Sequence, residues 1–337
     1  MNPDLSPEDA LRLNVLLAGE LLAVRLDEGA CTLYALTPKG EARIPLNPVG
    51  RAERYFQRVR ELLGGHALNS PGGYPVHLRR WTRMGQASEK NLEALLKLGA
   101  SEAVMAVAYA AGLTDELARR VWWASQNLAT MEVARVMLVQ PAVRAGAMGK
   151  VLAEYLIEHL PFEEDPIAAM QSVRAVLAAG LLDAEKRDQL WAKGKRRPYY
   201  LIGFLESLPD ALPLEPPRAM PDNLPDTPAG QLLARCYSGA GQSYLKTAEL
   251  TLEKPPAHEA VYLLLDLLGG YFAAGRAAAG LPVPPAEIAA LESLGRLSNV
   301  DGEPILTKTT AVGPLLRRHL EPLFAPIIGH LRVLRGL

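Results

Sequence analysis

The spacing of the apolar residues changes along this chain, and this change limits the possible folds more than any other feature. Between residues 22 and 46, apolar side chains alternate in three short runs that are separated by turns at 27–29 and 37–40. Alternation is typical of half-buried strands, and short turns join antiparallel neighbours. From Ser88 onward the apolar residues recur at helical spacing. The sequence therefore predicts a mainly α protein with a small N-terminal α/β module, 1–86, that contains an antiparallel meander.

A helix is predicted on each side of the meander. Ser6 followed by Pro7 is typical of a helix start, because the serine hydroxyl accepts a hydrogen bond from an orphan backbone N–H and proline has no N–H to satisfy. A second helix is expected over about 50–63, with Tyr55 on its apolar face. Residues 74–79 alternate again, which predicts one more short strand.

The helical part of the chain contains one internal repeat. Residues 110–123 and 178–191 match at seven of 14 positions, and both contain a Gly-Leu-x-Asp junction. Their offset of 68 residues is twice the ~34 residues of one helix-pair unit in α-solenoids. Each junction predicts that one helix ends at a glycine, which can be left-handed, and that a hydrophobic residue and an acidic or hydroxyl residue start the next helix. We therefore expect α-solenoid-like helix-pair repeats over 87–208. The tryptophans expected in their core are Trp122, Trp123 and Trp191.

A proline-rich segment divides the helical part. Residues 209–229 contain too many prolines for a helix, since each one removes a backbone hydrogen bond and clashes with the preceding turn. The segment is predicted to be either a linker or an extended strap across the surface. A second helical region is expected over 230–337.

Nothing in the sequence matches a catalytic, cofactor-binding or metal-binding motif. The six histidines never lie three to five residues apart, which argues against a local metal site. The stretch 146–151 lacks both the first glycine and the hydroxyl residue of a phosphate-binding loop. We accordingly expect no catalytic residue, no cofactor and no metal.

The composition indicates where such a chain works. Two cysteines, Cys31 and Cys236, are too few for a disulfide framework, and the acidic N-terminus is unlike a secretion signal. No apolar run reaches the ~18–20 residues of a membrane span. A net charge of −1 means that any site for a polyanion is local. The expectation is a soluble cytoplasmic protein without membrane insertion.

Arginine is concentrated between residues 51 and 83. Seven arginines and no lysine stand here against two glutamates, so the segment carries a net charge of +5. The planar guanidinium binds carboxylate or phosphate with two hydrogen bonds and stacks on rings. The predicted partner-binding residues are Arg79, Arg80, Trp81 and Arg83, with Arg51, Arg54 and Arg58 nearby.

A second cationic stretch, 193–200, places lysines and arginines beside two tyrosines. Arginine next to an aromatic ring is one way in which single-stranded RNA is held. Arg196, Arg197 and Tyr199 are therefore candidate nucleic-acid contacts, and an RNA-binding regulator is an alternative function. Both basic segments are also compatible with a solvated face that forms only internal ion pairs.

Five segments together resemble a known family. They are LNPVGRAERYFQRVRELLGG (46–65), NSPGGYPVHLRRWTRMGQ (69–86), GLTDELARRVWWA (112–124), YLIEHLPFEEDP (155–166) and LWAKG (190–194). These segments resemble the DsrS-type proteins of sulfur-oxidising bacteria, which are encoded with the genes of the reverse-acting dissimilatory sulfite reductase. The resemblance covers the N-terminal two thirds of the chain well and the C-terminal third less distinctly.

The resemblance implies a soluble accessory protein of cytoplasmic sulfur oxidation, and it implies no catalytic or cofactor residues. Repeat arrays offer extended surfaces to partners, so we expect a scaffold or adaptor that binds a protein partner, such as the sulfur-oxidation machinery, through its arginines. An RNA-binding regulator of sulfur-oxidation genes is the first alternative. A thiol or persulfide transferase that uses Cys31 or Cys236 is the second.

Overall fold

The structure is a computed structural model, and it describes residues 5–48, 50–68, 88–126, 128 and 130–337. The fold is mainly α with a small N-terminal α/β module, as predicted. The chain divides into two compact units, 1–156 and 157–337, and the division falls within helix α9 (Ala147–His159). Among the described residues, every helix is too short or too polar to cross a bilayer.

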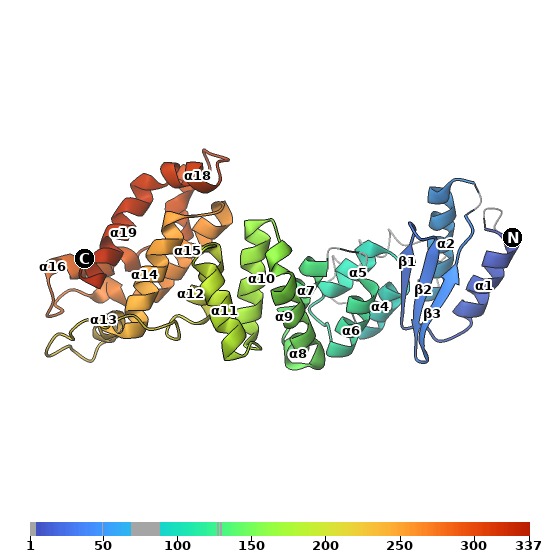
Figure 1. Cartoon of the computed structure of the whole chain (residues 1–337), viewed down its shortest axis with the longest axis horizontal. Helices are drawn as coiled ribbons and strands as arrows, with labels where there is room; N and C mark the ends of the chain where they lie inside the picture. Colours follow the sequence, from blue (N-terminus) through green and yellow to red (C-terminus); the bar gives the residue numbers. More distant parts are fainter. Residues whose placement is uncertain (1–4, 49, 69–87, 127, 129) are drawn as a thin grey trace. The chain divides into compact units, whose positions relative to one another are not determined.

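The first unit begins with a small sheet and two helices. The elements are α1 (Pro7–Leu17), β1 (Ala23–Asp27), β2 (Thr32–Thr37), β3 (Gly40–Pro45) and α2 (Ala52–Leu68). The strands form an antiparallel sheet in the order β1-β2-β3, with Val24 opposite Ala35. Helices α1 and α2 pack on one face of this sheet (Figure 1), and Leu13, Leu33 and Val59 lie in the core that they share.

Local signals in the sequence explain these boundaries. Ser6 has an extended backbone, its Oγ accepts the Asp9 N–H at 3.1 Å, and Pro7 occupies the first helical position. The predicted start of α1 and the predicted meander are therefore confirmed. Cys31, expected within a strand, lies instead in the turn between β1 and β2, where its φ is 47°. The strand predicted at 74–79 lies outside the described residues.

The first unit continues with short helices that pack in sequence. They are α4 (Glu89–Leu96), α5 (Ser101–Ala108), α6 (Asp115–Ala124), α7 (Thr130–Leu138), α8 (Pro141–Ala145) and α9. Helix α4 contacts α5 and α6, α5 contacts α6 and α7, and α6 contacts α7 and α8. Helices α4 and α6 also contact β1. Packing between consecutive helices is the arrangement that helix-pair repeats produce.

The two copies of the sequence repeat begin their helices at different positions. In the first copy, Thr114 is the N-cap of α6 and its Oγ1 accepts the N–H three residues on at 3.3 Å. In the second copy, Asp183 caps α11 (Ala184–Gly194) in the same way at 2.7 Å. Gly180 is left-handed, with φ of 68°, whereas Gly112 has no positive φ. The capping by a hydroxyl or acidic residue is therefore confirmed in both copies, whereas the left-handed glycine is present only in the second.

The tryptophans expected in the core are half-buried instead: Trp122, Trp123 and Trp191. Trp123 Nε1 donates to Glu41 Oε2 on β3 at 2.8 Å, and the Arg25 guanidinium of β1 lies 5.4 Å from its ring centroid. An indole carries a polar N–H that needs a partner when it is covered. Trp123 therefore lies at the border between the sheet and α6 rather than inside the apolar core.

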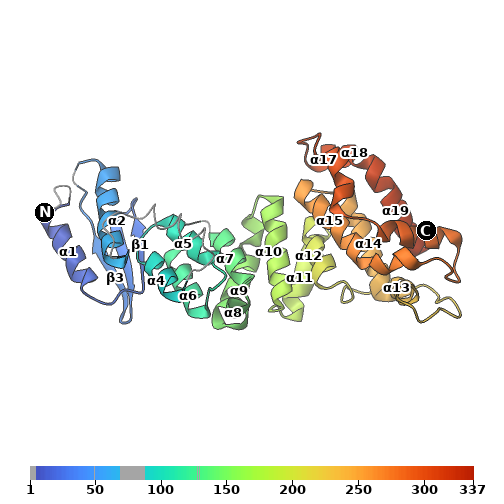
Figure 2. The ribbon, with the colours of Figure 1, turned by 180° about the vertical axis from the view of Figure 1, so that it is seen from behind.

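The second unit is a closed helical bundle. Its helices are α10 (Pro166–Ala179), α11, α12 (Tyr199–Ser207), α13 (Pro228–Tyr237), α14 (Gly239–Glu253), α15 (His258–Tyr271), α16 (Pro285–Gly295), α17 (Glu303–Leu306), α18 (Gly313–His319) and α19 (Glu321–Arg335). Short 3₁₀ segments lie at Leu160–Phe162, Ala273–Ala277 and Asn299–Gly302. Helix α14 packs on α15 and α19 (Figure 2). Helix α19 also packs on α16. The last helix therefore returns to earlier ones, which a linear array would not do.

The proline-rich segment between α12 and α13 is fastened to the second unit. The Arg218 N–H donates to the Tyr237 carbonyl at 2.9 Å, and the Glu215 N–H donates to the Gly239 carbonyl at 3.2 Å. The Arg218 guanidinium donates to the carbonyl of Leu334 in the last turn of α19 at 2.9 Å. These contacts make the segment a strap that connects α13 with the C-terminal helix.

Candidate interaction surface

Two arginines are exposed at the start of α2: Arg51 directly precedes the helix and Arg54 lies in its first turn. Arg51 and Arg54 are exposed, and neither side chain has an ion pair or hydrogen bond with any residue that the structure describes. Arg58, one helical turn on, is half-buried and its Nη1 donates to Glu61 Oε2 at 2.7 Å. Of these three arginines, all assigned to partner binding from the sequence, Arg51 and Arg54 are thus available to bind an outside group.

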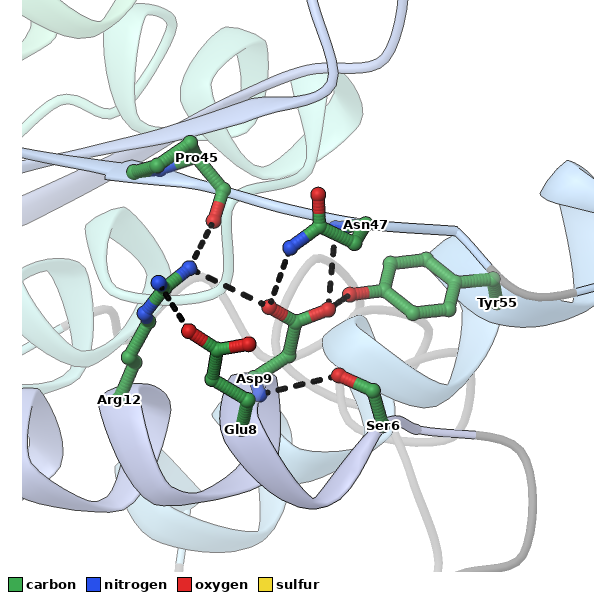
Figure 3. Close-up of polar contacts among 7 residues, drawn as sticks. All are labelled: Ser6, Glu8, Asp9, Arg12, Pro45, Asn47 and Tyr55. Carbon is green, nitrogen blue, oxygen red and sulfur yellow. Dashed lines mark hydrogen bonds and ion pairs between the residues drawn. The ribbon is translucent and has the colours of Figure 1, made fainter.

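Tyr55 anchors this turn of α2 through a buried carboxylate. Its hydroxyl donates to Asp9 Oδ2 at 2.6 Å, across 46 positions of sequence (Figure 3). The Asn47 backbone N–H donates to the same oxygen at 3.0 Å, and Asn47 Nδ2 donates to Oδ1 at 3.5 Å. The Arg12 guanidinium forms an ion pair with Oδ1 at 3.8 Å. Helix α1, the segment after β3 and the start of α2 therefore meet at one side chain, which fixes the turn that carries the exposed arginines.

Burial and hydrogen bonding act on the Asp9 carboxyl in opposite directions. Desolvation raises its pKa, but hydrogen bonds from Tyr55, Asn47 and Ser6 and the charge of Arg12 outweigh this effect, so the pKa lies below its ordinary value of 3.8. Burial and the contact with Asp9 also raise the pKa of Tyr55 well above its ordinary value of 10.0. At neutral pH the carboxylate is ionised and its oxygens accept from protein donors. It therefore acts as a structural anchor and not as a general base.

The sequence predicts the helix that carries Asp9 but not this role of its side chain. The signal that could have found it is its phase on α1. Asp9 lies one helical turn before Leu13 and two before Leu17, on the face that is buried. A charged group on an apolar face needs a hydrogen-bonding partner in the core, and Tyr55 on α2 supplies it.

Four predicted partner-binding residues lie outside the described residues: Arg79, Arg80, Trp81 and Arg83. Their assignment stays a prediction.

The second predicted basic site lies where α11 meets α12. Arg196 is exposed there, while Arg197 is half-buried and its Nη1 donates to the Tyr200 hydroxyl at 2.8 Å. Tyr199 is also half-buried, and its ring packs edge to face on Tyr200 with 5.1 Å between the centroids. The candidate contacts Arg196, Arg197 and Tyr199 thus gather at one corner, but the two tyrosine rings contact each other.

The two thiols have different environments. Cys236 is fully buried, and burial raises the pKa of its thiol to about 12. The thiolate is the reactive form of cysteine, so a buried and protonated thiol is a poor nucleophile. Cys31 is half-buried in the β1–β2 turn, where its Sγ lies 3.5 Å from the Glu28 carbonyl oxygen. The arrangement gives Cys236 a packing role in the second unit.

The stretch 146–151 contains the N-terminus of α9, and its backbone donors are already in use. Asp115 accepts the Ala147 N–H at 3.1 Å and the Met148 N–H at 2.9 Å. A Cβ on Gly146 would lie 2.2 Å from the Asp115 carboxyl group, so only glycine allows this contact. The carboxylate therefore occupies the place where a helix N-terminus binds phosphate. Within the described ranges, no cluster of His, Cys, Asp and Glu is arranged to hold a metal ion.

Comparisons with protein-family models, with curated proteins and with solved structures each find no match. The function must therefore be inferred from the chemistry of the surface.

Proposed function

We propose that this protein is a non-enzymatic accessory protein that binds a protein partner through Arg51 and Arg54 at the start of α2. The observation that carries the proposal is that Arg51 and Arg54 are exposed and unpaired within the described chain, on a turn that the Asp9–Tyr55 contact holds in place. Other arginines are neutralised by neighbouring carboxylates, as Arg60 is by Glu28. Two unpaired guanidinium groups on a fixed turn are suited to carboxylates on another protein.

The buried ionisable groups support a non-catalytic role. Asp9 and Glu287 each accept hydrogen bonds from a tyrosine hydroxyl and at least one further donor. The Cys236 thiol is buried, with a pKa of about 12. Catalytic acids and bases are instead held within reach of a substrate with a pKa near the working pH.

The resemblance to DsrS-type proteins supports a partner from cytoplasmic sulfur oxidation. Under this proposal the partner carries an acidic surface, because the side chains of Arg51 and Arg54 have no counter-ion among the described residues. Electrostatic complementarity of this kind mainly controls association rate and specificity.

The test is capture of partners from native lysate with a tagged chain, with one half of each sample treated with nuclease. The variant Arg51→Glu with Arg54→Glu reverses both charges. The control is Arg318→Glu, an exposed arginine that has no ion pair in the described chain and lies in the second unit. We expect wild type and control to retain the same proteins in both halves, and the double variant to retain about tenfold less, because like charges that face each other cost several kcal/mol.

Retention of the same proteins by the charge-reversed variant would remove the α2 assignment. Loss of the captured proteins on nuclease treatment would favour the RNA-binding regulator instead. All variants should unfold within about 0.5 kcal/mol of wild type, because exposed substitutions rarely change stability further.

A further inference from the structure

The junction between α11 and α12 is a rigid corner with four cations: Lys193, Lys195, Arg196 and Arg197. Gly194 is buried within it, and a Cβ at this position would lie 2.4 Å from Leu201 Cδ2 of α12. The Lys193 carbonyl accepts the backbone N–H groups of both Arg196 and Arg197 at 3.1 Å. Close packing and these turn hydrogen bonds fix the backbone from which the cations project.

Charge in this corner is not balanced within the fold. Lys193, Lys195 and Arg196 are exposed, and none of them has an ion pair in the part of the chain that the structure describes. The other arginines of the second unit are mostly paired with acids: Arg174 with Glu206, Arg218 with Glu287, Arg235 with Asp210, Arg317 with Glu321, and both Arg332 and Arg335 with Glu249. The corner therefore differs from the rest of its unit.

The placement of these four cations lowers the stability of the folded chain when no anion is bound. Lys193 lies in the last turn of α11, where the helix dipole favours a positive charge. Arg196 and Arg197 directly precede α12, whose N-terminus disfavours positive charge. Like charges so close in sequence also repel one another. An external anion would relieve both effects.

We propose that this corner binds an acidic segment of a partner protein. Bases of single-stranded RNA stack on exposed aromatic faces, and the two rings here are buried or half-buried. Tyr200 is only 1% exposed and Tyr199 is half-buried against it. A short cluster of point charges without an open ring matches carboxylates better than nucleotides. This site is separate in sequence from the α2 arginines and does not rest on their role.

The test measures fluorescence anisotropy of a labelled oligoglutamate peptide and of a single-stranded oligouridylate of matched charge, at low salt, with the full chain. The variant Lys195→Gln with Arg196→Gln removes two charges from the corner. The control is Lys308→Gln with Arg318→Gln, because both are exposed, lack ion pairs in the described chain and belong to the same unit. We expect the corner variant to bind the peptide about tenfold more weakly, which corresponds to two exposed ion pairs.

The control variant should bind the peptide as wild type does. Three results would overturn the proposal: no binding of the peptide by wild type, an equal loss in the control, or tighter binding of the oligouridylate that the corner variant abolishes. The last result would assign the corner to RNA. None of them bears on the α2 arginines, which the corner variant leaves intact.

Discussion

The Tyr55 hydroxyl donates a 2.6 Å hydrogen bond to the Asp9 carboxylate, and neither side chain reaches solvent. This contact joins α1 to α2 at the turn that presents Arg51 and Arg54. A structural anchor thus lies directly beneath the proposed contact surface. The contribution of the Tyr55–Asp9 hydrogen bond to stability can be measured without altering any exposed charge.

The substitution Tyr55→Phe is expected to lower the free energy of unfolding by about 1–3 kcal/mol, because it removes a donor from a buried carboxylate. Urea denaturation at neutral pH measures the loss. The matched control is Tyr109→Phe, which removes a hydroxyl that is bonded to Glu132 from a residue that is 55% exposed. The free energy of unfolding of this control should stay within about 0.5 kcal/mol of the wild-type value. Equal losses in the two variants would contradict the anchoring role.

Asp9 makes the stability depend on pH. Because its pKa is lower in the folded chain than the ordinary 3.8, its contribution is fully present above that value and is lost as the pH falls through the folded-state pKa. Asp9→Asn does not titrate, so it should be less stable than wild type at pH 7, and the difference should shrink below about pH 4. Unfolding free energies measured from pH 3 to pH 7 test this. If the difference in unfolding free energy between wild type and variant stayed constant across this range, the pKa of Asp9 in the folded chain would not lie below its ordinary value.

Arg218 holds the proline-rich strap to the bundle. Its Nη2 donates to Glu287 Oε1 at 3.0 Å, and Glu287 is 5% exposed. Arg218→Met leaves this carboxylate without its cation. The substitution should lower the free energy of unfolding by about 3 kcal/mol, as measured by thermal unfolding. The control is Arg296→Met, because Arg296 is largely exposed in its ion pair with Glu292. This substitution should lower the free energy of unfolding by less than about 0.5 kcal/mol. If both variants unfold alike, the strap is not fastened by this pair.

The Cys236 thiol should resist alkylation in the folded protein. Its pKa of about 12, against an ordinary 9.0, lowers the thiolate fraction at pH 7 by about a thousandfold, and burial blocks the reagent as well. In the Cys31→Ser variant, iodoacetamide should therefore label the chain only after denaturant is added, as mass spectrometry would show. Fast labelling of the native variant would revive thiol transfer through Cys236.

The N-terminal module could be read from the sequence in some detail. Ser6 and Pro7 predict the start of α1, and alternating apolar residues predict the three strands, because both signals act within a few residues. Arg54 lies off the apolar face that Tyr55 marks on α2, whereas Arg51 precedes the helix, so the exposure of Arg51 does not follow from helical phase. The repeat was harder to interpret. Asp115 and Asp183 match in sequence, yet Asp183 caps its own helix while Asp115 caps α9.

The sequence by itself determined the mainly α class, the meander and the positions of the basic segments. The signals in the sequence are the hydrogen bonds of helix caps and the spacing of apolar residues, and both involve residues that lie only a few positions apart. Only the tertiary structure decided that Asp9 meets Tyr55, that Trp123 meets Glu41 and that Arg218 meets Glu287, across 46, 82 and 69 positions. Such pairs depend on how whole elements pack. Packing in turn depends on the sum of many weak contacts, which no local pattern records.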